Sequence, residues 1–383
     1  MSSRVAARVA YAMLFAAIGA SFPYLPVHYR SVGLTLGEIG LLGSLAAAVG
    51  LLGAPLWGTL ADRYPTSRLI LPTAASLAAL AALGLALARQ PVAIAAAVVA
   101  MSAAQAGIAP MLDARALDTV RDDHDRYGGL RVWGSIGFVV AVWATGFLVE
   151  RAGIASLFTV YVPLLVITAL VAFLLRGASR AIAPLPRLSG IGLVLREPRL
   201  RGFLLAALAV WSASMAINAF LSIHLIDIGA PGELVGSAWA LGAIVEVPIM
   251  WGYPALSARF GARRLLVAGA AAFTLRALAL PLLTDPVLVT LTMLLHGAGF
   301  GLLLVGGVTY VSRRAPPGTA ATAQGVLTAV VFSLPLIIGP GLGGIAASAW
   351  GLPFMFGISA AIGLVAAVMM HVAVAEPAVA ADG

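Results

Sequence analysis

Long apolar runs recur along the whole of this sequence. A helix needs roughly 20 consecutive apolar residues to cross the hydrocarbon core of a bilayer. Apolar residues make up 61% of the chain and charged residues only 10%, too few charges for a water-soluble domain. We therefore predict an all-α membrane protein with twelve transmembrane helices. The twelve runs lie near 9–28, 36–61, 69–88, 92–114, 128–149, 154–175, 202–226, 234–257, 265–283, 286–311, 320–346 and 352–374.

The distribution of Arg predicts the orientation of these helices. All 23 basic residues are Arg, and the inner loops of membrane proteins carry an excess of basic residues. With the N-terminus in the cytoplasm, only Arg30, Arg89 and Arg151 fall in outer loops. We therefore expect both termini in the cytoplasm, in the inner membrane of a bacterium, and no nucleic-acid partner. The inner loops hold Arg4, Arg8, Arg63, Arg68, Arg121, Arg126, Arg176, Arg180, Arg187, Arg196, Arg199, Arg201, Arg259, Arg263, Arg264, Arg313 and Arg314.

The longest connection divides the chain into two six-helix halves. We predict an N-terminal half at 1–176, a cytoplasmic linker at 177–200, a C-terminal half at 201–376 and a tail at 377–383. A weak internal repeat supports this division, because Trp57-Gly58 ends the second run and Trp251-Gly252 ends the eighth, each before a cluster of Arg.

Three ionisable residues lie near the middle of apolar runs, where each one costs free energy unless it is paired. They are Glu246, Arg276 and His296. One interpretation is a buried salt bridge that only fixes helix packing. The other is a site for protons and substrate, because burial favours the neutral carboxyl group whereas a nearby Arg favours the ionised one.

Other polar residues allow two interpretations as well. Asp113 and Arg131 flank the connection between the fourth and fifth runs and are either interfacial or part of a site. Asn218 lies within an apolar run and either bonds to a neighbouring helix or contacts a ligand. We expect Arg115 to lie on a solvated loop face, and Thr35 with Glu38 to form a capping box that opens the second helix.

The segment from Gly58 to Arg68, GTLADRYPTSR, resembles the cytoplasmic signature loop of the major facilitator superfamily. In that family the acid and Arg of this loop latch the inner gate, which implies a gating loop containing Gly58, Asp62, Arg63 and Arg68. The alternative is a simple charge-rich turn. Tandem six-helix halves are also typical of these transporters, whose substrate site lies between the halves.

More closely, the chain resembles the branch that holds lactose permease and the 3-phenylpropionate permeases. The residues that carry this resemblance are Phe22-Pro23-Tyr24-Leu25-Pro26, Ala54-Pro55-Leu56-Trp57-Gly58 and the stretch YGGLRVWGSIGF at 127–138. The family pattern implies that Asp113 and Arg131, eighteen residues apart, hold the substrate. It also implies functional roles for Arg276 and His296.

Two positions depart from the lactose permease pattern. The proton-carrying Glu of those permeases stands three residues after the His, where this chain has Gly299, and their substrate Glu falls at Ala243. The phenylpropionate-like members have a Glu where Glu246 stands. This chain therefore resembles them more closely, and we assign proton carriage to Glu246.

These observations predict proton-coupled symport of a small organic solute: an aromatic carboxylate, a sugar or a nucleoside. The assigned substrate contacts are Asp113, Arg131, Trp133, Asn218 and His296, and the assigned proton-coupling residues are Glu246, Arg276 and His296. We expect a monomer that is not an enzyme. With no Cys, no P-loop and no metal motif, we also expect no cofactor or metal.

The main alternative is drug/proton antiport on the same fold. Drug antiporters carry a Gly-Pro signature in the fifth span, and the fifth run here has Gly134, Gly137 and Gly146 but no Pro. An intramembrane enzyme or a non-transporting receptor is a weaker alternative, since no hydrolase motif appears and the mid-span charges are present.

Overall fold

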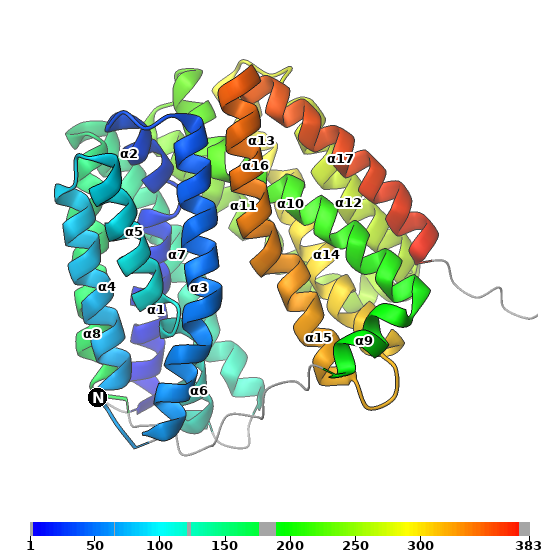
Figure 1. The fold of residues 1–383 in the computed structure, drawn as a ribbon, viewed down its shortest axis with the longest axis horizontal. Helices are drawn as coiled ribbons and strands as arrows, with labels where there is room; N and C mark the ends of the chain where they lie inside the picture. Colours follow the sequence, from blue (N-terminus) through cyan, green and yellow to red (C-terminus); the bar gives the residue numbers. More distant parts are fainter. Residues whose placement is uncertain (1–2, 65, 121–123, 176–188, 375–383) are drawn as a thin grey trace, which may run out of the picture. The chain divides into compact units, whose positions relative to one another are not determined.

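The computed structural model describes residues 3–64, 66–120, 124–175 and 189–374, with side chains described except at 120, 124–128 and 189. The described residues form helices, turns and short loops and contain no strand (Figure 1). Each of the twelve predicted apolar runs coincides with a helical stretch, which confirms the all-α prediction.

The chain divides into two compact units. Unit 1 comprises 1–184 with 219–240, and unit 2 comprises 185–218 with 241–383. Residues 177–188, half of the predicted linker, lie outside the described residues. The helices α10 (Pro198–Asp227) and α11 (Gly232–Phe260) each contribute to both units.

In unit 1, helix α1 packs against α7 and α8, and α5 packs against α3 and α4. Figure 1 shows these helices in blue to green. Unit 1 contains α1 (Ser3–Ser21), α2 (Leu25–Ser31), α3 (Leu36–Arg63), α4 (Ile70–Leu87), α5 (Pro91–Gln105), α6 (Ile108–Val120), α7 (His124–Ala152), η1 (Ile154–Ser156) and α8 (Leu157–Ala172).

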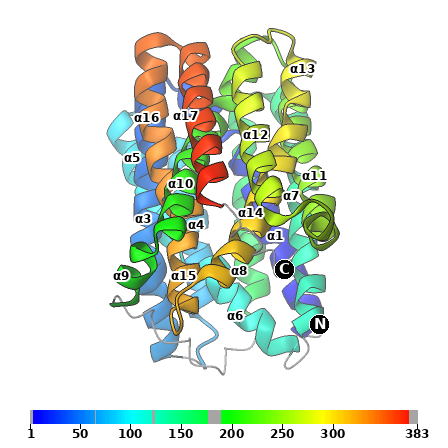
Figure 2. The same ribbon diagram turned by 90° about the vertical axis from the view of Figure 1, so that its right-hand side faces the viewer.

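In unit 2, helix α12 packs against α14 and α17, and α16 lies beside α17 (Figure 2). The aromatic rings of Phe273, Phe300 and Phe332 surround the fully buried Trp211 at the centre of this core. Besides parts of α10 and α11, unit 2 contains α9 (Ser189–Arg196), α12 (Ala262–Ala279), α13 (Pro286–Leu291), α14 (Met293–Arg314), α15 (Ala320–Thr328), the π-helical η2 (Ala329–Ser333), α16 (Leu334–Trp350) and α17 (Leu352–Ala373).

Eleven helical stretches within the described residues are long and apolar enough to cross a membrane. The ninth predicted span, α12, is not among them. It has 18 residues, as many as α4, but three of them are charged: Arg263, Arg264 and Arg276. Arg263 and Arg264 belong to the basic end of the helix, whereas Arg276 is buried inside unit 2.

Close packing between α11 and α14 depends on glycine. A Cβ atom on Gly297 would lie 2.5 Å from the carbonyl oxygen of Gly242, and one on Gly301 would lie 2.7 Å from the side chain of Ile249. Small residues at such positions allow membrane helices to approach closely. This packing brings the turn of α11 that carries Glu246 directly against α14.

The N-terminus of α3 forms the predicted capping box. The backbone N–H of Glu38 donates to the Thr35 hydroxyl over 3.2 Å, and the Thr35 N–H donates to the Glu38 carboxylate over 2.8 Å. This arrangement satisfies two backbone donors that a helix start would otherwise leave unpaired.

Arg115 contradicts its predicted place on a solvated loop face. It lies within α6 and is 5% exposed. Its guanidinium donates to the backbone oxygens of Ser67 and Ala172, over 3.1 and 3.4 Å. The dense run of charges after it in the sequence obscured the fact that the helix continues to Val120.

Candidate functional site

The first candidate site is formed by Tyr11, Asp113 and Arg131 in unit 1, which we call the Tyr11 cluster. The hydroxyl of Tyr11 donates to Asp113 Oδ1 over 2.5 Å, and Arg131 Nη1 lies 3.7 Å from the same oxygen. The guanidinium carbon of Arg131 also lies 5.5 Å from the centroid of the Phe15 ring. Helices α1, α6 and α7 thus bring Asp113 and Arg131 together.

The exposure of this cluster is suited to ligand contact. The side chains of Arg131 and Asp113 are 53% and 34% exposed, whereas Tyr11 is buried. Ionisable residues in membrane helices almost always face the interior of the bundle or a water-filled cavity. A buried hydroxyl that holds a partly exposed ion pair gives that pair a defined orientation, with donors and acceptors available to a polar solute.

Sequence reasoning missed Tyr11. Its only signal in the sequence is a hydroxyl group inside an apolar run, and many tyrosines share that signal. The hydrogen bond that gives Tyr11 its place joins residues 102 positions apart, so neither spacing nor helix periodicity reveals it.

The second candidate site is the Arg276 cluster in unit 2, formed by Asn218, Arg276, Met293 and His296. Nη1 of Arg276 donates to Asn218 Oδ1 over 2.9 Å and lies 3.2 Å from His296 Nδ1. Nη2 lies 3.3 Å from the sulfur of Met293. The ring of Phe273 stacks on His296 at a centroid distance of 5.5 Å.

The positively charged guanidinium of Arg276 lies in a buried position. Arg276 is only 1% exposed, and its Nε–H has no hydrogen-bond partner among the residues that the structure describes. Within the described part of the chain, no carboxylate oxygen lies within 4.0 Å of the guanidinium. Transfer of an unpaired cation out of water is costly, so this cluster is a place where an anion or a cluster of hydroxyl groups would be stabilised.

Glu246 stands apart from Arg276 in this structure. Its side chain is half-buried on α11 and forms no ion pair with any described residue. The expected pairing of Glu246 with Arg276 is therefore not seen.

Gly299 is tightly enclosed, because a Cβ atom there would lie 2.5 Å from the Phe273 ring. That contact leaves no space for the Glu found at this position in lactose permeases.

Of the other assigned substrate residues, two belong to the Arg276 cluster and one belongs to neither cluster. Asn218 and His296 both belong to the Arg276 cluster. Trp133 lies on α7 two residues after Arg131, which turns it about 200° around the helix. Its half-exposed indole therefore points away from the Tyr11 cluster.

The predicted gating loop lies at the end of α3. Asp62, Arg63 and Arg68 are exposed, and the Arg63 guanidinium lies over the Tyr64 ring, 6.0 Å from its centroid. Among the residues whose placement is described, Asp62 forms no ion pair. The bond from Arg115 to the carbonyl oxygen of Ser67 fixes this loop to α6.

Sequence reasoning also missed a set of contacts between α7 and the N-terminus of α11. The carboxylate of Glu150 accepts from the N–H of Gly232 over 2.6 Å. The hydroxyl of Tyr24 bridges the two helices, because it lies 2.8 Å from the carbonyl oxygen of Val142 on α7 and 3.4 Å from that of Gly232 on α11. A Cβ atom on Gly146 would lie 2.4 Å from the carbonyl oxygen of Gly232. These contacts explain why residues 219–240 group with unit 1.

Solved transporter structures share this fold. The nucleoside transporter NupG superposes with a TM-score of 0.88 over 98% of this chain and 100% of its own, at 17% identity. A bacterial homolog of the human lysosomal transporter Spinster superposes with a TM-score of 0.74, over 97% of this chain and 96% of its own, at 16% identity.

Several proteins similar in sequence to this chain are transporters. The maltose permease of Geobacillus stearothermophilus is 32% identical over 326 residues, covering 84% of this chain and 82% of that protein. A putative nucleoside transporter of Escherichia coli is 25% identical, covering 85% and 80%. Residues 5–358 match the MFS_1 like family. The chain is therefore a multi-pass membrane transporter, not an enzyme, and it belongs to the MFS_1 like family of the major facilitator superfamily.

Proposed function

We propose that this transporter moves a small hydroxyl-rich solute, a sugar or a nucleoside, together with protons into the cell. The observation that carries the proposal is the Tyr11 cluster, where a hydroxyl group orients a partly exposed carboxylate and guanidinium. A carboxylate accepts hydrogen bonds from solute hydroxyls and a guanidinium donates them. The names of the maltose permease and nucleoside transporter relatives support the same solute class.

In this proposal twelve helices, including α12, cross the inner membrane with both termini in the cytoplasm, and the carrier acts as a monomer. The strong bias of Arg toward the inner loops supports the orientation. The two halves are the six-helix segments 1–176 and 201–376, and the gating loop Gly58, Asp62, Arg63 and Arg68 lies on the cytoplasmic side.

Glu246 carries the proton in this account. It is a half-buried carboxyl group within α11, without an ionic partner among the described residues, so its proton can leave or return as its surroundings change. The adjacent helix α14 carries His296, which belongs to the Arg276 cluster. The packing of α11 on α14 therefore connects Glu246 with that cluster. Substrate binding changes that packing and thereby the proton affinity of Glu246.

A second candidate solute is an aromatic carboxylate. The buried Arg276, with its unpartnered Nε–H and no carboxylate nearby in the described structure, favours this class. A guanidinium binds a carboxylate through two parallel hydrogen bonds. A probable 3-phenylpropionic acid transporter of Escherichia coli is 27% identical over 79% of this chain.

The test uses the purified protein in liposomes that contain a pH-sensitive dye. Maltose, xanthosine, 3-phenylpropionate and a lipophilic cation are added outside, one at a time. Symport predicts that the lumen becomes acidic with maltose or xanthosine. Acidification with 3-phenylpropionate alone would favour the second candidate if it exceeds the passive acidification of protein-free liposomes. Alkalinisation with the cation would replace symport by drug/proton antiport.

A further inference from the structure

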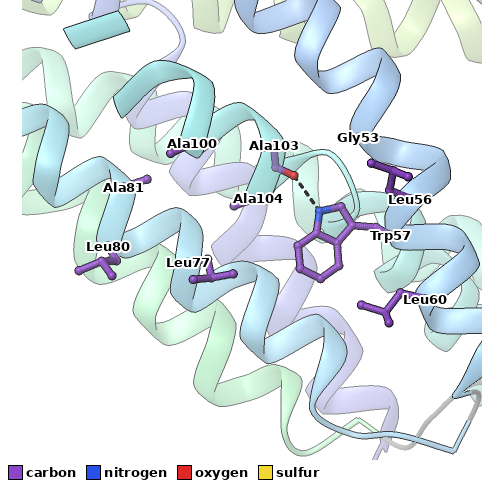
Figure 3. Close-up of a pocket in the computed structure, with 10 residues that line it drawn as sticks. All are labelled: Gly53, Leu56, Trp57, Leu60, Leu77, Leu80, Ala81, Ala100, Ala103 and Ala104. Atoms are coloured by element: carbon purple, nitrogen blue, oxygen red, sulfur yellow. Dashed lines mark hydrogen bonds between the residues drawn. The ribbon is translucent and has the colours of Figure 1, made fainter. Parts of the chain in front are cut away.

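Unit 1 contains an apolar groove that the transport proposal does not use. The groove has a volume of about 590 Å³ and lies between α3, α4 and α5 (Figure 3). Its lining consists of Gly53, Leu56, Trp57, Leu60, Leu77, Leu80, Ala81, Ala100, Ala103 and Ala104. Both α3 and α4 pack against α5, and the wall residues Leu56 and Leu80 are 70% and 66% exposed.

The lining offers no polar group to a ligand. Trp57 is the only lining residue with a polar side-chain atom, and its indole N–H already donates to the carbonyl oxygen of Ala103 over 2.7 Å, as Figure 3 shows. A polar solute or a drug with hydrogen-bonding groups would lose its water without replacement there. The groove therefore selects a hydrocarbon chain.

The length and position of the groove fit one leaflet of a bilayer. Its α3 residues run from Gly53 to Leu60, in the half of the helix that ends at Arg63. At 1.5 Å per residue, Gly53 and Arg63 are about 15 Å apart along the helix. This is half the thickness of a ~30 Å hydrocarbon core, and in the proposed orientation it is the cytoplasmic half.

Two exposed Arg residues lie close in sequence to the groove residues of α3, beyond Leu60. Arg63 follows Leu60 by three residues and Leu56 by seven, so it lies on the same face of α3 as these two groove residues. Arg68, also exposed, precedes α4. The acidic Asp62 is turned about 100° from Arg63 around the helix, away from the groove face.

From these observations we propose that the groove binds one acyl chain of an anionic phospholipid of the inner leaflet, with its phosphate at Arg63 and Arg68. Phosphate groups and Arg form strong charge-assisted hydrogen bonds, and basic residues at a membrane surface attract anionic lipids. The bound lipid lies beside the gating loop, so it is placed to stabilise one position of that loop.

The test is native mass spectrometry of the full-length protein, stripped of lipid and then titrated with phosphatidylglycerol or phosphatidylcholine of identical chains. Ala100→Phe fills the groove, and Ala96→Phe, one turn away on α5 and also exposed, is the matched control. Losing contact with about two methylene groups lowers lipid affinity roughly tenfold. We expect that loss in Ala100→Phe and not in Ala96→Phe.

Separate variants test the contribution of the Arg charge to lipid binding. Arg63→Gln is expected to lower phosphatidylglycerol affinity about fivefold and phosphatidylcholine affinity less, because the choline cation of phosphatidylcholine offsets the charge of its phosphate. Arg259→Gln, exposed near the end of α11, is the control and should have little effect. Equal retention of the two lipids by the wild-type protein, or equal retention of phosphatidylglycerol by both Ala→Phe variants, would overturn the proposal.

A spectroscopic measurement covers the case in which Ala100→Phe does not fold. Phosphatidylglycerol with brominated acyl chains should quench the fluorescence of wild-type protein more than that of Trp57→Phe, because only the former has an indole in the groove. Equal fractional quenching of the two proteins would contradict an acyl chain at this site.

Discussion

The buried Arg276 permits a direct distinction between a structural charge and a functional one. If Arg276 only fixes helix packing, Arg276→Met should preserve transport wherever it preserves the fold. If the guanidinium serves substrate binding and coupling, Arg276→Met should abolish transport while the protein stays folded. We predict the second outcome.

The structure gives the size of the stability change. The substitution removes two hydrogen bonds from a charged donor, to Asn218 and His296, each contributing about 1.5–3 kcal/mol. It also removes the desolvation penalty of a buried guanidinium, which is several kcal/mol. The two effects oppose each other, so the free energy of unfolding should change by no more than about 2–3 kcal/mol.

Two assays check this prediction together. Thermal stability in detergent, followed by size-exclusion chromatography after heating, measures the fold. Counterflow of radiolabelled solute in liposomes measures transport. The double variant Arg276→Met/Asn218→Leu removes both partners of the hydrogen bond and should be nearly as stable as the wild type.

Arg30→Met is the matched control. Arg30 forms an exposed ion pair with Asp227 at 3.5 Å, and such pairs contribute about 0–1 kcal/mol. It should therefore transport normally. Wild-type transport by Arg276→Met would refute our reasoning, and so would a collapse of stability in both the single and the double variant, because Arg276 would then be a structural residue.

Three further predictions concern individual contacts. Tyr11→Phe removes a hydrogen bond to the Asp113 carboxylate and should raise the KM of transport about tenfold, since such bonds contribute about 1.5–3 kcal/mol; an unchanged KM would exclude a role for the hydroxyl group. Gly297→Ala should lower the free energy of unfolding by about 1–3 kcal/mol through overpacking, whereas Gly84→Ala, with open space around it, should raise it by up to about 1 kcal/mol; thermal unfolding that ranks the two variants the other way would contradict the packing of α11 on α14. Arg115→Met should release the predicted gating loop and speed tryptic cleavage within residues 63–68, and unchanged cleavage would show that Arg115 does not hold the loop.

The helical architecture could be predicted from the sequence because bilayer thickness fixes the length of an apolar run. The run at 36–61 became α3 with its predicted capping box at Thr35 and Glu38. The ninth run, 265–283, was predicted as a span. Its helix α12 is nevertheless not among the helices that composition alone identifies as membrane spans, because Arg276 adds a third charge to its 18 residues. Burial of that Arg is a tertiary property, which hydropathy does not contain.

The site residues were only partly accessible to sequence reasoning. Asp113 and Arg131 were identified through their spacing in a related family, and the structure brings them within ion-pair distance. Tyr11 and the burial of Arg115 were missed, because both depend on contacts between helices distant in the sequence. A resemblance identifies positions, whereas the partners of each side chain follow from the three-dimensional packing.

Glu246 offers the most direct test of the central claim, that a proton gradient drives solute uptake through this residue. Liposomes with wild-type protein, Glu246→Gln or Glu233→Gln are given an acidic exterior and radiolabelled solute, and accumulation is compared with counterflow at equal pH. Glu233, in the first turn of the same helix, supplies the control. We expect the wild type and Glu233→Gln to accumulate solute above equilibrium, and Glu246→Gln to perform counterflow alone. Accumulation by Glu246→Gln at the wild-type level would contradict the account.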